Sequence, residues 1–189
     1  ILLGEEAEVL EHANRLGFDV SGAQIVSLSD DRYTEKFAEK YAELRAKKGV
    51  TIEQARERMQ DPSYFGTMMV YQGLADGMVS GATHTTANTI RPALEFVKTK
   101  PGVSVVSGAF LMAMEDRVLV FADCAVNPDP SAEQLADIAM SSAATARAFD
   151  IEPRVAMLSY STGTSGSGAD VEEVKQATEI VLERGPDFA

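Results

Sequence analysis

The sequence is poor in the residues that bind metals or form disulfides. Among its 189 residues there is one cysteine, Cys124, and there are two histidines, His12 and His84. A single cysteine cannot form a disulfide within the chain, and two histidines without further cysteines do not supply the usual set of zinc ligands. The sequence therefore predicts no metal site, and the absence of a disulfide fits a protein of the reducing cytoplasm.

Long apolar runs and an excess of positive charge are also missing. No apolar stretch approaches the roughly 20 residues that a helix needs to cross a bilayer, and the acidic, amphipathic N-terminus does not look like a signal peptide. The sequence contains 17 Lys and Arg residues and 29 Asp and Glu residues, which gives a formal net charge of −12. We therefore expect no membrane and no nucleic acid as a partner. A protein of this charge could still bind a small anion, but it would need a few Arg side chains and backbone N–H groups that converge on the anion.

The hydrophobic residues, 45% of the sequence, fall into short apolar runs that alternate with helical patterns. This alternation predicts an α/β fold with a mainly parallel sheet. Only about five residues separate two of the runs, which predicts an antiparallel hairpin and therefore a mixed sheet in the second half. The expected strands, mostly buried on both faces, are Ile25–Leu28, Met78–Ser80, Val103–Met112, Val118–Ala122 and Val155–Ser159.

Helix starts and breaks divide the chain further. The start signals are Thr51 with Gln54, Asp61 before Pro62, Ser131 with Gln134, and Asp170 with Glu173. The Pro-Gly pair in Thr99–Gly102 breaks both helix and strand, so the best boundary separates residues 1–100 from residues 101–189. Ile1–Leu3 is expected to be a strand and Asp187–Ala189 the start of another. Since both ends look cut, we expect this chain to be a fragment of a longer protein.

The strongest local signal for a ligand is the hydroxyl-rich segment Ser159–Gly168 between a predicted strand and a predicted helix. Glycines let successive backbone N–H groups converge, hydroxyls add donors, and the helix that follows presents its positive end. Such a segment can hold a phosphate-like anion. It lacks the spacing of a P-loop and of a dinucleotide fingerprint. On pattern alone, a flexible turn without a ligand remains the alternative.

Two arginines have different local patterns. Pro92 suits the first turn of a helix, which would place Arg91 at the positive helix end, where a cation is disfavoured by ~0.3–1 kcal/mol. An anion beside Arg91 would explain this placement, and a surface arginine is the alternative. Arg45 looks like part of an ordinary charged helix end before the capping residue Gly49.

Cys124 follows a predicted buried strand, and an acyl-carrying role is one hypothesis for it. A reactive thiolate needs a histidine or a helix N-terminus that lowers the thiol pKa, and the sequence cannot place His84 beside it. A lone cysteine at a buried strand end is usually a packing residue.

Taken together, several long blocks resemble the phosphate acetyl/butyryltransferase family, and its acetyl-specific branch more than the butyryl one. The blocks occur in the family's order and cover nearly the whole chain. They are Glu43–Arg45 with Lys48, Gly49 and Thr51; Asp76–Ala82; Thr85–Leu94; Val120–Pro130; Ala132–Ala136; and Ile151–Gly163.

The resemblance implies an acyltransferase of acetate metabolism that catalyses acetyl-CoA + phosphate ⇌ acetyl phosphate + CoA in the cytoplasm. It implies a fold like that of isocitrate and isopropylmalate dehydrogenases, with mixed, mainly parallel sheets in two lobes around a cleft. Residues 1–100 would be part of the first lobe and residues 101–189 part of the second. No metal or redox cofactor is expected, coenzyme A being a substrate. Since relatives are commonly dimers, a homodimer is expected.

By motif, Arg45 and Arg91 match the arginines that contact coenzyme A in the family, which overturns the ordinary interpretation of Arg45. Phosphate or acetyl phosphate is placed at the loop residues Ser161, Thr162, Gly163, Thr164, Ser165 and Gly166. The family's catalytic Asp and its Ser-Arg partners lie downstream of Ala189, and its opening strand and glycine turn are missing. We therefore expect no catalytic residue in this chain and no activity from the chain alone.

Some alternatives and one departure from the family pattern remain. Phosphate butyryltransferase, a non-catalytic domain that binds CoA or another anion, and an acyl-enzyme at Cys124 are the other candidate functions. Asp150 stands where many relatives have glycine after a helix. We expect it to adopt a left-handed conformation, which Asp tolerates with some strain.

Overall fold

The computed structural model describes all 189 residues, Ile1–Ala189. The chain forms two compact units, Ile1–Lys98 and Thr99–Ala189. Both contain helices and strands, as an α/β chain requires. Their sheets have only two strands each, one sheet parallel and the other antiparallel. None of the helices is long and apolar enough to span a membrane.

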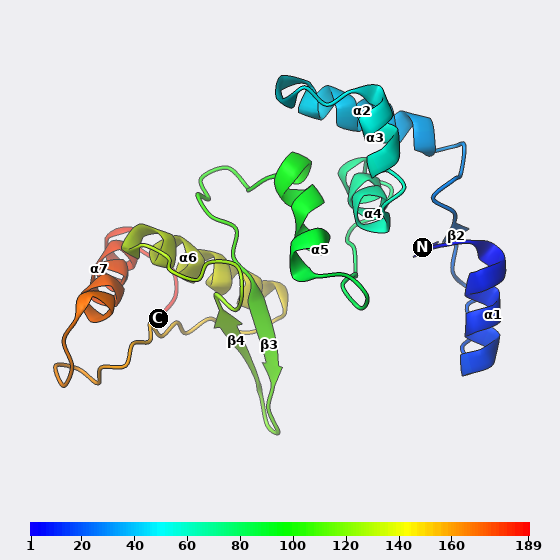
Figure 1. Ribbon diagram of the computed structural model, residues 1–189. Coiled ribbons are helices and arrows are strands. Elements are labelled where there is room, and N and C mark those ends of the chain that lie inside the picture. The colour runs from blue at the N-terminus through cyan, green and yellow to red at the C-terminus, as the bar shows by residue number, and fades with distance from the viewer. The chain divides into compact units, whose positions relative to one another are not determined.

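The first unit opens with a parallel strand pair. Strand β1 (Leu2–Leu3) pairs with β2 (Ile25–Val26), and helix α1 (Glu6–Leu16) connects them. Figure 1 shows α1 beside β2 at the blue end of the chain. The expected strand at Ile1–Leu3 is confirmed, and the one at Ile25–Leu28 is confirmed over its first half.

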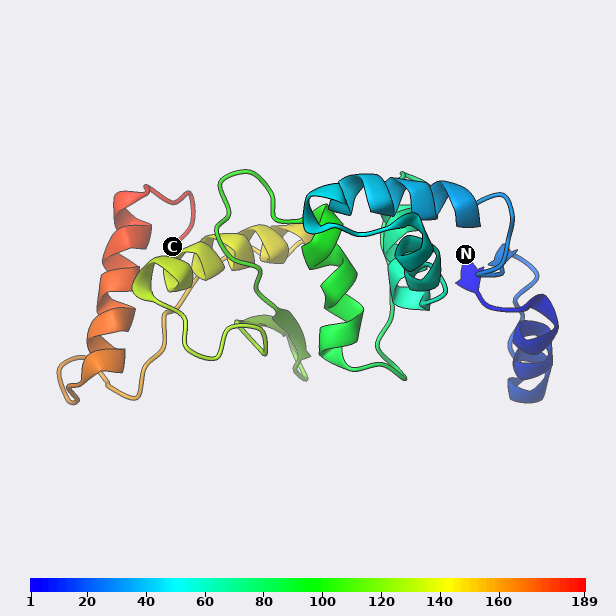
Figure 2. The same cartoon turned by 45° about the horizontal axis from the view of Figure 1, so that its top comes forward.

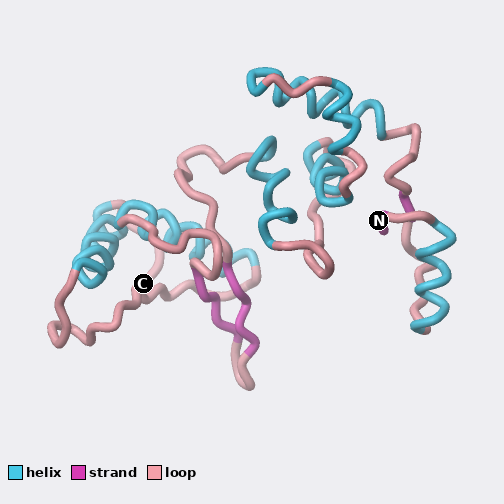
Figure 3. The backbone as a smooth tube through the Cα atoms, viewed as in Figure 1, coloured by secondary structure: helices cyan, strands magenta, loops and turns pink.

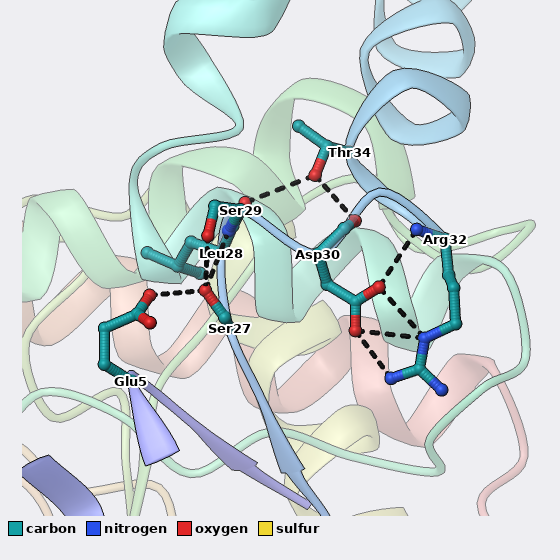
Figure 4. Close-up of polar contacts among 7 residues, drawn as sticks. All are labelled: Glu5, Ser27, Leu28, Ser29, Asp30, Arg32 and Thr34. Atoms are coloured by element: carbon teal, nitrogen blue, oxygen red, sulfur yellow. Dashed lines mark hydrogen bonds and ion pairs between the residues drawn. The ribbon is translucent and has the colours of Figure 1, made fainter. Parts of the chain in front are cut away.

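Side-chain hydrogen bonds hold the turn that follows β2, as Figure 4 shows. Ser27 donates its hydroxyl proton to Glu5, and Thr34 donates to the carbonyl of Asp30 at 2.8 Å. Arg32 forms an ion pair with Asp30 at 2.6 Å. Because these groups satisfy one another, the cluster stabilises the entry into the next helix.

The helices of the first unit pack around an aromatic core. They are α2 (Thr34–Arg45), the short 3₁₀ helix η1 (Ala46–Lys48), α3 (Ile52–Arg58), α4 (Pro62–Tyr71) and α5 (Thr86–Pro92), which continues into the π-helical turn η2 (Ala93–Val97). The rings of Tyr41, Tyr64 and Phe96 meet edge to face with centroids 5.7–5.8 Å apart. Burying one such side chain contributes roughly 1.5–3 kcal/mol.

Two of the helix starts expected in this unit are confirmed. Thr51 and Gln54 form a reciprocal capping box at α3. Asp61 caps α4 by accepting the N–H of Ser63 at 2.7 Å, and Pro62 occupies the first turn. These signals act within four residues, so the local sequence is enough to predict them.

The expected strand at Met78–Ser80 is wrong. No strand pairs with this segment, and the Val79 side chain is fully exposed. A strand needs a neighbour for its backbone hydrogen bonds. The Met78 side chain lies so close to Gly66 that a Cβ atom there would be 2.8 Å from its sulfur, so glycine permits the close approach of this segment to α4.

The expected helix start at Pro92 is also wrong. Helix α5 begins six residues earlier, at Thr86, after the N-cap Thr85, whose hydroxyl accepts the N–H of Asn88 at 3.2 Å. Pro92 lies inside the helix, where it has no N–H to donate to the carbonyl four residues back. The helix widens after Pro92, and Lys98 donates to the carbonyl of Ala93, five residues earlier, at 2.8 Å. Arg91 therefore lies at the carboxyl end of α5 and not at its positive end.

The second unit begins with the expected antiparallel hairpin. Strand β3 (Ala109–Ala113) pairs with β4 (Val118–Ala122), and Phe110 stands opposite Phe121. Figure 3 shows the two strands in magenta. The first strand is shorter than Val103–Met112, because the ladder with β4 begins at Ala109 and residues 103–108 form no strand pairing. Burial on both faces was wrong, since Phe110 is 55% and Phe121 53% exposed.

Two helices form the core of the second unit. Helix α6 (Ala132–Ala148) and helix α7 (Ala169–Glu183) pack against each other, and Figure 2 shows them as neighbours that run in different directions. The capping box at Ser131 and Gln134 is confirmed. Asp150 has a φ of 56°, which confirms the left-handed conformation expected there.

Two expectations for the second unit are wrong. Helix α7 begins at Ala169 after the N-cap Gly168, so Asp170 lies in its first turn, Glu173 lies further along the helix, and neither caps it. Residues 155–159 form no strand, and Leu158 is exposed. Val155 does donate its N–H to the carbonyl of Ala189 at 2.7 Å. One hydrogen bond between these segments does not make a ladder, so neither forms the expected strand.

Candidate functional site

Arg45 is held at the end of α2 with part of its guanidinium unsatisfied. Its Nη1 donates to the carbonyl oxygen of Glu95 at 3.3 Å. The Nε atom is buried and has no hydrogen-bond partner. A buried donor without a partner costs about 1–3 kcal/mol, so Arg45 retains unused capacity to bind an anionic acceptor.

Arg91 lies one helical turn before Glu95, in the same unit. Its side chain is exposed on α5, and it is close enough to Tyr64 to act on the phenol pKa. Arg45 contacts the Glu95 backbone. The two arginines expected from the sequence to bind CoA therefore share one neighbourhood around Glu95 and Tyr64.

Neither of these arginines has a carboxylate partner within 4.0 Å. Half of the chain's arginines do form ion pairs: Arg32–Asp30, Arg56–Glu35, Arg117–Asp116, Arg147–Asp187 and Arg184–Asp137. In a chain with a net charge of −12, carboxylates are abundant. Leaving Arg45 and Arg91 unpaired keeps two positive charges available to an anion.

Glu95 connects this neighbourhood, and nothing in the sequence pointed to it. The Tyr41 hydroxyl donates to Glu95 Oε2 at 2.6 Å across 54 residues of sequence. Burial, and then this hydrogen bond to a carboxylate, raises the pKa of Tyr41. Tyr41 therefore stays protonated and remains a donor at any physiological pH. The buried Tyr64 hydroxyl has no hydrogen-bond partner, and its pKa is raised by burial and then by the charge of Glu95.

The hydroxyl-rich loop lies in the second unit, immediately before α7. Its hydroxyl groups bind the backbone of the loop itself. Ser161 Oγ accepts the N–H of Gly166 at 2.9 Å, and Ser165 Oγ accepts the N–H of Thr162 at 3.0 Å. Gly163 has a φ of 59°, which a residue with a side chain rarely adopts. The loop is thus an ordered turn, and some of its N–H groups are already bonded.

Tyr160 closes this loop over the start of α7. Its hydroxyl donates to the carbonyl of Ser167 at 3.1 Å. A Cβ atom at Gly168 would collide with the same hydroxyl, so only glycine fits there. Gly168 provides no side-chain cap for α7, and the positive helix end has Asp170 and Glu172 in its first turn. These carboxylates already interact favourably with the helix dipole.

Cys124 lies in a loop organised by the neighbouring carboxylate. Asp123 accepts the N–H of Gly108 at 2.8 Å, and both the N–H and the side-chain amide of Asn127. Although partial burial acts to raise it, these hydrogen bonds bring the pKa of Asp123 down to about 2. The Cys124 thiol is half-buried against Gly108.

His84 and Cys124 belong to different compact units, so neither unit contains both this thiol and a histidine that could act as its base. His84 lies in the first unit, where its ring interacts with the Thr83 hydroxyl at 3.2 Å, and Cys124 lies in the second. No group of three or more His, Cys, Asp or Glu side chains has the geometry to hold a metal ion. The arrangement offers anion binding at the arginines and at the loop, and it shows no nucleophile–base pair.

Comparison with known proteins gives the same family along the whole chain. A family model described as phosphate acetyl/butaryl transferase matches residues 1–189. Relatives named phosphate acetyltransferase include those of Nitratidesulfovibrio vulgaris, 60% identical over 188 residues, and Synechocystis, 57% identical over 190 residues. All of this chain is aligned in both cases, but it spans only 27% of each relative's length.

Solved structures agree with these sequence relatives. A phosphotransacetylase from Streptococcus pyogenes superposes with a TM-score of 0.84 at 48% identity, over 100% of this chain and 58% of that one. The EutD phosphotransacetylase from Staphylococcus aureus gives a TM-score of 0.85 at 42% identity, over 97% of this chain and 56% of that one.

Proposed function

The chain belongs to the phosphate acetyl/butaryl transferase family, and on that premise we propose that it is part of an enzyme that moves an acetyl group between coenzyme A and inorganic phosphate. The observation that carries the proposal is the identity of 57–60%, along the whole chain, to relatives named phosphate acetyltransferase. The unpaired arginines supply what an acidic protein needs to bind an anionic substrate.

Arg45 and Arg91 are proposed to bind the phosphate groups of coenzyme A. Neither forms an ion pair within 4.0 Å. Arg45 donates to the Glu95 carbonyl, and Arg91 lies one helical turn before Glu95. An arginine and an anionic oxygen ~4 Å apart interact by about 4 kcal/mol at an effective dielectric constant of 20. Screening by solvent reduces this value for the exposed Arg91.

The loop Ser161–Gly166 is proposed to bind phosphate or acetyl phosphate. Its serine and threonine hydroxyls can turn from the loop backbone to an anion, and Gly163 lets the backbone approach it closely. The start of α7 follows this loop and adds a favourable dipole, although its first turn is acidic.

In the reaction proposed, a base removes the proton of the CoA thiol. The thiolate then forms a bond to the acetyl carbonyl carbon, and the bond between that carbon and the phosphate oxygen breaks. The residues of this chain hold the two substrates in place and stabilise the negative charge of the transition state. By resemblance to the family, the base is an Asp downstream of Ala189. No metal or redox cofactor is needed for these steps.

The finer fold and assembly are also proposals that the family resemblance supports. We place residues 1–100 in the first and residues 101–189 in the second of two α/β lobes like those of isocitrate dehydrogenase. The intact protein is proposed to be a cytoplasmic homodimer.

The test uses the full-length protein and follows the formation of acetyl phosphate from acetyl-CoA and phosphate. Arg91→Ala should raise the KM for CoA at least tenfold in the reverse reaction, roughly the effect of 1.4 kcal/mol. Arg45→Lys keeps the positive charge but loses the planar guanidinium with its paired donors, and should raise the KM for CoA less. Arg15→Ala, at the exposed end of α1, is the matched control. An unchanged KM in Arg91→Ala would remove that residue from the site.

The other candidate functions predict different results in the same assays. Binding of CoA without turnover in the full-length protein would favour a non-catalytic domain. A higher kcat/KM with butyryl-CoA than with acetyl-CoA would favour the butyryl branch. Loss of activity in Cys124→Ala, with the fold intact, would favour an acyl-enzyme.

A further inference from the structure

A carboxylate lies among the cations of the first unit without pairing with any of them. Glu95 is half-buried on the π-helical turn η2. Around it are Arg45, which donates to its carbonyl, and Arg91, one turn earlier. A third cation, Arg58, lies over the ring of Tyr64 at 5.4 Å. Glu95 nevertheless forms no ion pair within 4.0 Å.

Tyr41 explains why the carboxylate stays unpaired. Its buried hydroxyl donates to Glu95 Oε2 at 2.6 Å, which is a short, charge-assisted hydrogen bond. The Tyr41 ring packs edge to face against Tyr64 and Phe96, with centroids 5.7 and 5.8 Å apart. These rings fix the direction of the hydroxyl, so Tyr41 holds the carboxylate in one position.

Glu95 reaches this position on the turn that follows Pro92. Pro92 has no N–H to donate to the carbonyl of Asn88, and the π-helical turn η2, Ala93–Val97, follows it directly. Such π-helical turns are frequent at functional sites. On this turn the carbonyl of Glu95 accepts from Arg45, and the carboxylate of Glu95 accepts from Tyr41.

We infer that Glu95, held by Tyr41, is a positioning and charge-tuning residue. Its carbonyl orients Arg45, and its carboxylate limits the positive charge that Arg45 and Arg91 present to the anionic substrate. The inference rests on the proposed role of these two arginines in binding CoA. A residue that only supported the fold would weaken binding when replaced. A tuning carboxylate opposes the substrate's charge, so removing that charge strengthens binding.

Two substitutions in the full-length enzyme give opposite expected results. Glu95→Gln keeps an acceptor for Tyr41 and the backbone carbonyl for Arg45 but loses the negative charge. It should lower the KM for CoA by roughly three- to tenfold, the effect of one partly screened charge at a few ångströms. Tyr41→Phe frees the carboxylate to pair with an arginine, and should raise the KM for CoA by a similar factor. The KM for acetyl phosphate should change in neither variant.

The double variant and a control separate this effect from a loss of structure. Tyr41→Phe combined with Glu95→Gln should return to the lower KM of Glu95→Gln alone, because the freed side chain is then neutral. The ring of Tyr71 also packs on Phe96, but its hydroxyl makes no hydrogen bond. Removing that hydroxyl in Tyr71→Phe should leave the KM for CoA unchanged.

The results also separate this inference from the proposed function. If Arg91→Ala raises the KM for CoA but Glu95→Gln leaves it unchanged or raises it, the tuning role is refuted and the CoA site stands. If Arg45→Lys and Arg91→Ala both leave the KM unchanged, the CoA site itself is refuted, and the tuning role with it.

Discussion

At the scale of single residues, Asp123 organises a loop that leaves β4. Its carboxylate accepts hydrogen bonds from the N–H groups of Gly108 and Asn127. The side-chain amide of Asn127 in turn donates to the carbonyl of Val106 at 2.8 Å. Two stretches of backbone, residues 106–108 and residues 123–127, therefore depend on one charged group. Its half-buried place makes each of these hydrogen bonds stronger than it would be in water.

The low pKa of Asp123, about 2 against an ordinary value of 3.8, predicts a loss of stability in acid. Above pH about 4 the carboxylate is charged in both the folded and the unfolded chain, and it contributes on the order of 1 kcal/mol to folding once solvent screening is included. As the pH falls from about 4 toward 2, the unfolded chain takes up the proton first, so this stabilisation disappears. The protection of the Gly108 and Asn127 amides against hydrogen exchange, taken relative to their intrinsic exchange rate at each pH, should therefore fall over that range.

Asp123→Asn is the matched variant for this pH dependence. It keeps an acceptor oxygen but cannot be charged, so protection of the two amides should be lower at pH 7 and nearly independent of pH below 4. If the natural protein and the variant show the same acid profile, another group controls the loop.

The residue scale also shows what sequence reasoning misses. Arg45 and Arg91 were found because they belong to motifs of the family. Tyr41 and Glu95 were missed, because Tyr41 looks like any core aromatic and its partner lies 54 residues away. No local pattern carries information about a hydrogen bond across that separation.

At the scale of elements, capping boxes were predicted correctly, whereas only some of the expected strands formed. The capping boxes at Thr51 and Ser131 are present as expected, since their hydrogen bonds lie within four residues. The strands expected at Met78–Ser80 and Val155–Ser159 are missing. A strand depends on a partner elsewhere in the chain, and an apolar run does not reveal whether that partner is present.

Pro92 was misplaced for a related reason. The sequence signal of proline at a helix start is correct on average, but it cannot distinguish that place from a widened turn late in a helix. Thr85, whose hydroxyl caps α5, carried the better signal.

The capping box of α6 gives a prediction at this scale. Ser131→Ala removes the acceptor of the Gln134 N–H and should lower the free energy of unfolding of the second unit by about 1 kcal/mol. Ser142→Ala, on the same helix, loses only a bond to the carbonyl of Ile138 and should change it by less than about 0.5 kcal/mol. Chemical denaturation, monitored through hydrogen exchange of the α6 amides, measures both changes in the free energy of unfolding. Equal effects of the two variants would contradict a special role for the cap.

At the scale of the whole molecule, the chain is two compact units, each with its own core. The arginines proposed to bind CoA belong to the first unit and the loop proposed to bind phosphate belongs to the second. The sequence predicted a boundary at Thr99–Gly102 from its Pro-Gly pair. It also identified the family, because its motifs occur in order along nearly the whole chain.

The isolated chain of 189 residues should not catalyse the reaction proposed for the full-length protein. It spans 27% of the length of two relatives and 58% of one solved structure, and the family's catalytic Asp and Ser-Arg pair are expected downstream of Ala189. Incubation with acetyl-CoA and phosphate should give no acetyl phosphate above the protein-free blank, whereas the full-length protein should form it. Turnover by the isolated chain would show that its own residues suffice for the chemistry.

The Ser161 hydroxyl gives the loop before α7 a property that its composition alone does not suggest. It accepts one N–H of the loop and donates to the carbonyl of Gly163 at 3.1 Å, so the turn keeps its shape without help from a bound molecule. Without that hydroxyl, the Gly166 N–H would be free to donate to an oxygen of the bound anion, which would make the enthalpy of binding more favourable. The slackened turn would lose more conformational entropy on binding. Such opposing changes largely cancel, so calorimetry would register the role of Ser161 where affinity alone would conceal it.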